Sequence, residues 1–329
     1  MQFAPRLLQW HQKFGRHHLP WQQTENPYFI WASEIMLQQT QVITVIPYYL
    51  KLIQKFPSVE DLANCSMDDF LGFWSGLGYY QRAKHMIRCA QIITSNYHGQ
   101  FPNQYDLLLQ LPGIGPSTAA AIMAQAFNAP YAILDGNVKR VLSRLHGLNE
   151  CIDSTKGMHE LWHLANHHMP KTECRTYTQA IMDLGATVCQ KKPQCGICPM
   201  SDICEAHKSQ LQNTLPIRKK KRPVSEFIIS CHVYRNSQKE YGLIQRPSSG
   251  IWQDLLFFPP SAKKGNQSIK QTHLLTHRKL EISYEIQHTE PLGITHWLTK
   301  EQLLHSAIPN ALRRVIGEID HVFNLGDSV

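Results

Sequence analysis

Hydrophobic residues recur at intervals of three and four along the first two thirds of the chain, from residue 5 to about residue 207. Val138, Val141, Leu142 and Leu145 are one such set, and this spacing lines a single face of an α-helix. Proline and glycine residues mark the breaks between these runs. We therefore expect the first part of the chain to be all-α.

The pattern changes after Leu215. Three short β-rich runs follow, of which the last alternates strictly: FIISCHVYR (227–235), YGLIQRP (241–247) and KLEISYEI (279–286). Helical periodicity returns near residues 299–318. We predict a helical domain over 1–215, a basic linker over 216–225 and an α+β domain over 226–329.

Composition supports two folded domains, since 43% of the 329 residues are hydrophobic. No apolar run is long enough for a signal peptide or a membrane span, which indicates a cytoplasmic protein. The net charge of +8 comes mostly from one tract, residues 218–223, which has five basic residues and no acidic one. This tract is expected to be a solvated tether that touches phosphates, and a dedicated recognition role is the alternative.

Four of the nine cysteines are clustered. Cys189, Cys195, Cys198 and Cys204 are separated by five, two and five residues. In a chain without an export signal, such cysteines are typical of metal ligands, and four thiolates at this spacing can enclose one compact centre. An iron-sulfur cluster is favoured; zinc, which usually takes two close pairs, and free thiols are the alternatives.

The stretch LPGIGPSTAAAI (111–122) predicts a tight turn between two helices. We expect Gly113 and Gly115 to permit a left-handed turn, and Pro116 to begin the second helix. The exposed backbone amides of this turn could bind a phosphate oxygen. A plain joint between helices is the alternative.

Two carboxylates are candidates for acid-base chemistry. Glu34 lies in a predicted helix that Asn26 and Pro27 begin, and its neighbours on the same face are apolar: Ile30, Trp31 and Leu37. An apolar environment favours the neutral carboxyl, as a general acid requires, although a buried, hydrogen-bonded glutamate without a catalytic role has the same pattern. Asp135 precedes GNVKRVLSRL and is predicted to cap that helix.

Together these motifs resemble a known superfamily. LPGIGPSTA, LDGNVKRVLSR and the four cysteines are similar to the helix-hairpin-helix DNA glycosylases of the endonuclease III type. WASEIMLQQTQV (31–42) and GLGYYQRA (76–83) resemble the MutY-type adenine DNA glycosylases, and the resemblance covers essentially the whole chain. It implies a helix-hairpin-helix glycosylase fold with one 4Fe-4S cluster, followed by a Nudix-like domain.

The resemblance also implies an activity, the hydrolysis of the N-glycosidic bond of adenine mispaired with 8-oxoguanine or guanine in base-excision repair. Glu34 would protonate the adenine, and Asp135 would stabilise the cationic sugar. Ser117 stands where the lyases of the superfamily have a catalytic lysine, and a hydroxyl cannot form an imine. The alternatives are an endonuclease III-like glycosylase and lyase for oxidised pyrimidines, and a catalytically silent lesion-binding protein.

Contacts with double-stranded DNA are expected from both parts of the chain. Gln38 and Tyr79 match residues that the family inserts into the duplex. Arg140 is a candidate phosphate contact, and the remaining candidates are Gln39, Gly113, Gly115, Ser117, Asn137 and Lys139.

In the C-terminal domain, Leu275, Thr276 and His277 correspond to a Phe-Ser-His signature, so Thr276 and His277 would recognise the opposite base while the aromatic residue is replaced. The acidic residues of this domain are dispersed, which argues against pyrophosphatase activity. We expect a monomer that acts in the cytoplasm of a bacterium, in association with the nucleoid.

Overall fold

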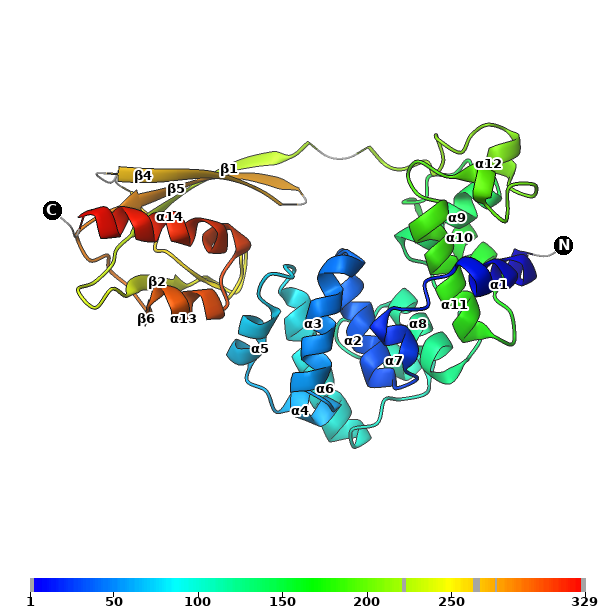
Figure 1. Cartoon of the computed structure of the whole chain (residues 1–329), viewed down its shortest axis with the longest axis horizontal. Helices are drawn as coiled ribbons and strands as arrows, with labels where there is room; N and C mark the ends of the chain where they lie inside the picture. The colour runs from blue at the N-terminus through cyan, green and yellow to red at the C-terminus, as the bar shows by residue number, and fades with distance from the viewer. Residues whose placement is uncertain (1–2, 221–222, 263–266, 276, 327–329) are drawn as a thin grey trace. The chain divides into compact units, whose positions relative to one another are not determined.

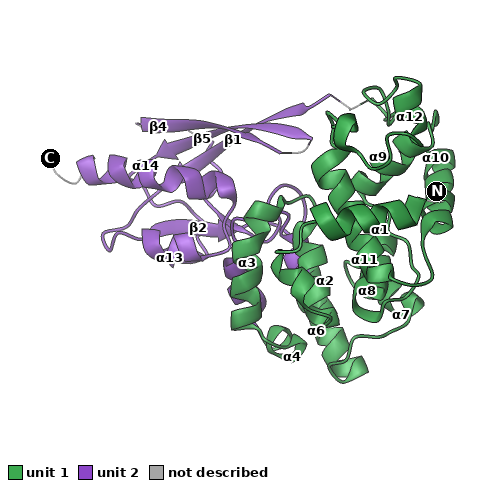
Figure 2. Ribbon diagram, turned by 45° about the vertical axis from the view of Figure 1, so that its right-hand side comes forward, with its two compact units in different colours: residues 1–64, 85–220 green, residues 65–84, 221–329 purple. Residues whose placement is uncertain are grey.

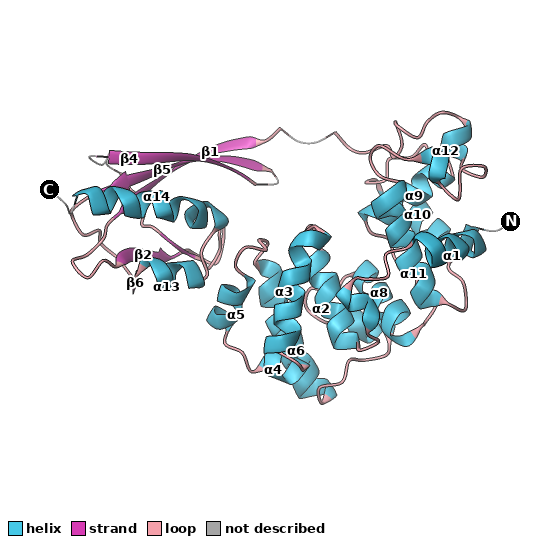
Figure 3. Cartoon of the chain, in the orientation of Figure 1, coloured by secondary structure: helices cyan, strands magenta, loops and turns pink. Residues whose placement is uncertain are grey.

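The computed structural model describes residues 3–220, 223–262, 267–275 and 277–326. The chain forms two compact units: residues 1–64 with 85–220, and residues 65–84 with 221–329 (Figure 2). Helices occupy the chain up to residue 208, and the described strands all follow residue 224 (Figure 3). The predicted all-α first part and α+β second part are therefore confirmed. The sequence did not predict that residues 65–84 group with the C-terminal unit.

Helices joined by turns and loops make up the part of the chain before residue 209 (Figure 1). Their bounds are α1 Phe3–Phe14, η1 Pro20–Gln23, α2 Pro27–Leu37, α3 Val42–Lys55, α4 Val59–Ala63, α5 Met67–Trp74, α6 Gln81–Tyr97, α7 Tyr105–Leu109, α8 Pro116–Phe127, α9 Gly136–Leu145, α10 Thr155–His168, α11 Cys174–Asp183, η2 Leu184–Val188, η3 Cys195–Ile197 and α12 Glu205–Lys208. None of the helices that the structure describes is both long and apolar enough to cross a membrane.

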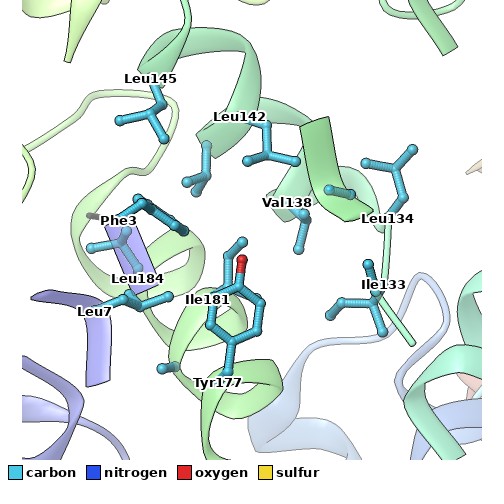
Figure 4. Close-up of a cluster of buried hydrophobic side chains, with 14 of the residues drawn as sticks. Phe3, Leu7, Ile133, Leu134, Val138, Leu142, Leu145, Tyr177, Ile181 and Leu184 are labelled. Carbon is cyan, nitrogen blue, oxygen red and sulfur yellow. The ribbon is translucent and has the colours of Figure 1, made fainter. Parts of the chain in front are cut away.

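A buried apolar cluster packs α1, α8, α9 and α11 together (Figure 4). Helix α1 contributes Phe3 and Leu7, and α9 contributes the periodic set beginning at Val138. Tyr177 and Ile181 come from α11. Ala120 and Ala121 of α8 are also buried here, and their small side chains allow the helix to approach its neighbours closely.

The second unit contains two three-stranded sheets. In one, β1 (Ser225–Val233) pairs in parallel with β5 (Arg278–Ile286), which pairs antiparallel with β4 (Gln267–Leu274). The other has the order β3-β2-β6, with bounds Leu256–Phe257, Tyr241–Gln245 and His296–Leu298. Helices α13 (Lys300–His305) and α14 (Asn310–Gly326) follow. The three predicted strands are confirmed, and the Nudix-like character of this unit stays a prediction.

Residues 65–84 join the second unit through polar contacts. The Tyr80 hydroxyl donates a hydrogen bond to the carbonyl of Ile308 at 2.7 Å. Lys84, whose side chain is largely buried, forms an ion pair with Asp254. The second unit thus takes its stability from two stretches that lie far apart in the sequence.

The beginning of the predicted linker is bound to the first unit. The Ile152 amide donates to the carbonyl of Ile217 at 2.9 Å, and the Lys219 amide donates to Asp153 at 3.3 Å. The described tether between the units is therefore shorter than residues 216–225, and two of its basic residues, Lys221 and Arg222, lie outside the described part of the chain.

Candidate functional site

The glycine turn lies between α7 and α8, as the sequence predicts. Gly113 has a φ of 79°, which favours glycine, and a Cβ atom there would lie 2.8 Å from the Cβ of His85. Gly115 differs from the expectation, because its φ of −93° is open to any residue. No atom lies within 4 Å of a Cβ placed on Gly115. The first turn of α8 lacks acceptors for its N–H groups within the helix, so the hairpin can bind an anion.

Ser117, in the first turn of α8, has a structural contact that the sequence did not predict. Its hydroxyl accepts a hydrogen bond from the Leu134 amide at 3.1 Å. Leu134 directly precedes Asp135, so this serine ties the hairpin to the segment that positions the aspartate. No imine can form at this position.

Asp135 is the N-cap of α9, as predicted. Its Oδ1 atom accepts from the amides of Asn137 at 3.0 Å and Val138 at 2.7 Å. Burial raises the pKa of Asp135, while these two amides and the charges of Arg140 and Lys139 act in the opposite direction. The ionised carboxylate is thus poorly solvated, and a cation placed against it would be stabilised strongly.

Glu34 is half-buried on α2, which Asn26 caps by accepting from the Tyr28 amide at 2.9 Å. The Nε2 atom of Gln125 donates to Glu34 Oε1 at 2.9 Å. Burial raises the pKa of Glu34 to about 7; the Gln125 hydrogen bond opposes this shift and the charge of Asp135 adds to it. The structure thus brings together two carboxyls that interact electrostatically, and one of them holds its proton close to neutral pH.

Two predicted DNA contacts follow α2 directly. Gln38 ends this helix, and its side-chain amide donates to the Thr118 hydroxyl of α8 at 3.4 Å. Gln39 is exposed and has a φ of 57°, in the left-handed region that glutamine rarely adopts. Both glutamines therefore lie in the sharp turn between α2 and α3.

The predicted contacts on α9 have different surroundings. Lys139 is half-buried, and the Asn137 side chain accepts from Arg140 at 2.9 Å. Arg140 also donates to the carbonyls of Gly185 and Cys189, each at 2.7 Å. These acceptors direct Arg140 toward the cysteine-containing loop, and its phosphate contact stays a prediction. Lys139 is the stronger phosphate candidate of the two.

The remaining candidate residues belong to the second unit. Tyr79 is 47% exposed with a φ of 50°, and the guanidinium of Arg82 lies over its ring at 5.4 Å. In the turn between β4 and β5, Leu275 packs against the apolar core of this unit and His277 is exposed. Thr276 lies outside the described residues.

The four cysteines line one cavity next to α9. The buried Arg144 guanidinium donates to Cys189 Sγ at 3.4 Å and to three backbone carbonyls: Gln190 at 2.5 Å, Lys191 at 3.1 Å and Leu215 at 3.0 Å. Within the described part of the chain no carboxylate pairs with it. A buried cation requires an anionic partner, and a cluster held by four thiolates is such a partner. The residues present fit an iron-sulfur centre.

Sequence reasoning missed Arg144 and Gln125. In each case the signal in the sequence is a polar residue within an apolar run. Arg144 lies between Leu142 and Leu145 of α9, and Gln125 follows AAAIMA in α8. A long polar side chain on a buried helical face needs a partner, and its presence there indicates a buried polar network.

Comparisons with known proteins agree with this geometry. Residues 32–167 match the HhH-GPD superfamily of base excision DNA repair proteins, and residues 191–204 match the iron-sulfur binding domain of endonuclease III. The chain is 38% identical to an adenine DNA glycosylase of Buchnera aphidicola (subspecies Baizongia pistaciae), over 89% of the chain and 86% of that protein. It is 31% identical to the adenine DNA glycosylase of Rattus norvegicus, over 95% of the chain and 77% of that protein.

Two solved structures share the fold of part of the chain. A thermostable thymine-DNA glycosylase is 30% identical with a TM-score of 0.59, covering 63% of this chain and 95% of that one. An endonuclease III in a non-covalent DNA complex is 21% identical with a TM-score of 0.55, covering 64% and 95%. With the paired carboxyls, the hairpin and the four-cysteine cavity, these similarities show that the chain belongs to the adenine DNA glycosylase family of helix-hairpin-helix base-excision repair proteins.

Proposed function

We propose that this adenine DNA glycosylase acts on adenine mispaired with 8-oxoguanine or guanine in double-stranded DNA, as a monomer in the cytoplasm of a bacterium. The observation that carries the proposal is the pair of Glu34 and Asp135. One carboxyl has its pKa raised to about 7, and the other is held by a helix N-terminus. This is the pair that cleavage of a glycosidic bond needs.

In the proposed reaction, protonated Glu34 donates its proton to a ring nitrogen of the adenine. The N-glycosidic bond then breaks, its electron pair leaves with the base, and positive charge develops on the sugar. Asp135 stabilises that charge, and water completes the hydrolysis. Ser117 offers no amine, so the sugar-phosphate backbone remains intact.

The adenine must leave the base stack before it can reach these carboxyls. We propose that the backbone amides at Gly113 and Gly115 bind a phosphate, with Ser117 in the same helical turn, and that Lys139 and Asn137 lie against the same strand. Gln38 would enter the duplex, where its amide can bond the orphaned partner base, and Gln39 is a further DNA contact of the same turn. Tyr79 of the second unit would also enter the duplex, where its ring can stack on a base.

We infer that residues 226–329 of the second unit form a Nudix-like domain that reads the opposite base through Thr276 and His277. The support is the resemblance of this turn to the family signature and the exposure of His277. Leu275, which is partly buried against the apolar core of the unit, stands in place of the family's aromatic residue.

We propose that Cys189, Cys195, Cys198 and Cys204 hold the 4Fe-4S cluster of this family; all four line one cavity, and residues 191–204 match the iron-sulfur binding domain. When bound, the cluster supplies a compact anionic centre that cross-links the loop. Arg144 and Arg140 tie the same loop to α9, and α9 begins at the Asp135 cap, so the loop supports the catalytic aspartate from a distance.

A strand-cleavage assay tests the proposal. Duplexes would contain adenine opposite 8-oxoguanine, adenine opposite guanine, or thymine glycol opposite adenine, each analysed with and without alkali. Cleavage at the two adenines only after alkali is the expected result. Alkali-independent cleavage at thymine glycol would instead show an endonuclease III-like lyase, and absence of cleavage in every duplex would show a silent lesion-binding protein.

A further inference from the structure

Three glutamines form a continuous hydrogen-bonded relay that ends on Glu34. Gln22 Nε2 donates to Gln179 Oε1 at 2.9 Å, Gln179 Nε2 donates to Gln125 Oε1 at 2.5 Å, and Gln125 Nε2 donates to Glu34 Oε1 at 2.9 Å. Gln125 and Gln179 are buried, and the relay runs from η1 through α11 and α8 to α2. All four residues belong to the first unit.

The direction of the relay is set at its outer end. The backbone amide of Leu19 donates to Gln22 Oε1 at 3.3 Å, and a backbone N–H can only donate. Gln22 must therefore present its NH₂ group to Gln179, which must present its own NH₂ group to Gln125. A reversed amide at any point would set two donors or two acceptors against each other inside the protein, which is costly.

Gln125 consequently presents a donor, and never its carbonyl, to one oxygen of Glu34. In a protonated carboxyl the oxygen that accepts such a hydrogen bond is the carbonyl oxygen, since the hydroxyl oxygen is the weaker acceptor. The proton of Glu34 is then placed on Oε2. The relay thus selects which of two otherwise equivalent oxygens carries the proton for transfer.

We propose that Gln125 is a positioning residue of the glycosylase reaction, oriented through Gln179 and Gln22, and that it fixes both the rotamer of Glu34 and the oxygen that delivers the proton. This inference rests on the proposed role of Glu34 as the general acid. Gln125 acts through Glu34 and need not touch the adenine.

Few charged groups face this relay. At the inner end Asp135 raises the pKa of Glu34, and the Gln125 donor lowers it. At the outer end Arg175 donates to the Gln22 carbonyl at 3.1 Å and pairs with Glu25. On α11, one turn beyond Gln179, the buried Asp183 forms an ion pair with Arg16 at 2.6 Å and also lies 3.2 Å from His11 Nε2. Gln125 and Asp135 are thus the two side chains whose replacement would shift the pKa of Glu34.

The test is the pH profile of single-turnover adenine excision by the full chain with its cluster, on a duplex with adenine opposite 8-oxoguanine. Gln125→Met keeps the side-chain volume and removes the donor. Losing a hydrogen bond to the ionised form raises the pKa of Glu34, so the alkaline limb should move up by about one to two pH units. The maximum rate should fall about tenfold, because the proton is no longer held on one oxygen. The dissociation constant for the duplex, taken from the dependence on enzyme concentration, should stay the same.

Gln22→Met is the second variant, chosen because it lies at the half-buried outer end and leaves the core intact. Gln22→Met should move the alkaline limb of the pH profile upward as well, but by a smaller amount. Gln23→Met is the matched control: this exposed neighbour donates to the His17 carbonyl and lies outside the relay, so its profile should be that of the wild type.

An alkaline limb unmoved in both Gln125→Met and Gln22→Met would overturn the inference, and Gln22→Met alone decides if Gln125→Met does not fold. The Glu34→Gln variant distinguishes a failure of the relay inference from a failure of the proposed function. If Glu34→Gln still excised adenine, Glu34 would not be the acid; if it were inactive while the relay variants kept the wild-type profile, the relay inference alone would fail.

Discussion

Replacing Glu34 by glutamine should abolish adenine excision and at the same time stabilise the protein at alkaline pH. The amide introduced by Glu34→Gln keeps the shape of the side chain and an oxygen for the Gln125 donor, but it has no proton to transfer. The native state raises the pKa of Glu34 from 4.5 to about 7, chiefly through burial. The folded protein therefore binds this proton more tightly than the unfolded chain does.

The sign of the stability effect follows from linkage. Between pH 4.5 and about 7 the native state binds more protons at Glu34 than the unfolded state, so this carboxyl lowers the free energy of unfolding as pH rises through that window. Ionisation of Glu34 lowers the free energy of unfolding by less than about 1 kcal/mol at pH 5 and by at most about 3 kcal/mol at pH 8. Glu34→Gln removes it, and the melting temperature at pH 8 should rise by roughly 6 to 12 °C, with little change at pH 5.

Thermal unfolding of the wild type and of Glu34→Gln at pH 5 and pH 8, with equal iron content, measures this difference directly. Single-turnover excision on the same preparations measures the loss of activity. Equal melting temperatures at both pH values would refute the claim that the site holds a destabilised carboxylate. A stabilised variant that kept its activity would instead refute the role of Glu34 as the acid while leaving the electrostatic reasoning intact.

Three further predictions concern the elements around Glu34. Asp135→Asn should lose excision measured by alkali-dependent cleavage, yet unfold in urea within about 1 kcal/mol of the wild type, because asparagine caps helices as well as aspartate does. Arg144→Met should lower the bound iron per chain and the visible absorbance after purification, since the guanidinium that donates to Cys189 Sγ is lost; unchanged iron content would contradict its role. Gly113→Ala should destabilise the protein by about 1 to 3 kcal/mol and weaken duplex binding measured by fluorescence anisotropy, because its φ of 79° and the nearby His85 Cβ exclude a side chain.

Features that depend on neighbours in the sequence could be predicted from the sequence alone. The Asn26 and Asp135 caps, the start of α8 at Pro116 and the apolar surroundings of Glu34 all follow from residues within one helical turn. The grouping of four cysteines likewise needs only their spacing. Local side-chain chemistry dominates at each of these positions, so tertiary context does not alter the outcome.

Features that depend on distant partners could not be predicted. The hydrogen bond between Gln125 and Gln179 joins residues 54 positions apart, and the apolar run before Gln125 indicates a buried polar residue but not its partner. Strand β4, QSIKQTHL, is too polar to be recognised by hydrophobic alternation, and it is held by pairing with β5. Gly115 was expected to need a left-handed backbone, but Gly113 alone makes the turn.

The grouping of residues 65–84 with the C-terminal unit has a consequence for the order of events during synthesis. Lys84 and Tyr80 leave the ribosome long before their partners, Asp254 and Ile308, have been made. Contacts of such long sequence separation close late in folding. Residues 65–84 must therefore wait for most of the chain, and a nascent protein that stops after residue 215 has a lysine ammonium at position 84 without its carboxylate. Synthesis of the last helices thus completes the stretch that carries Tyr79.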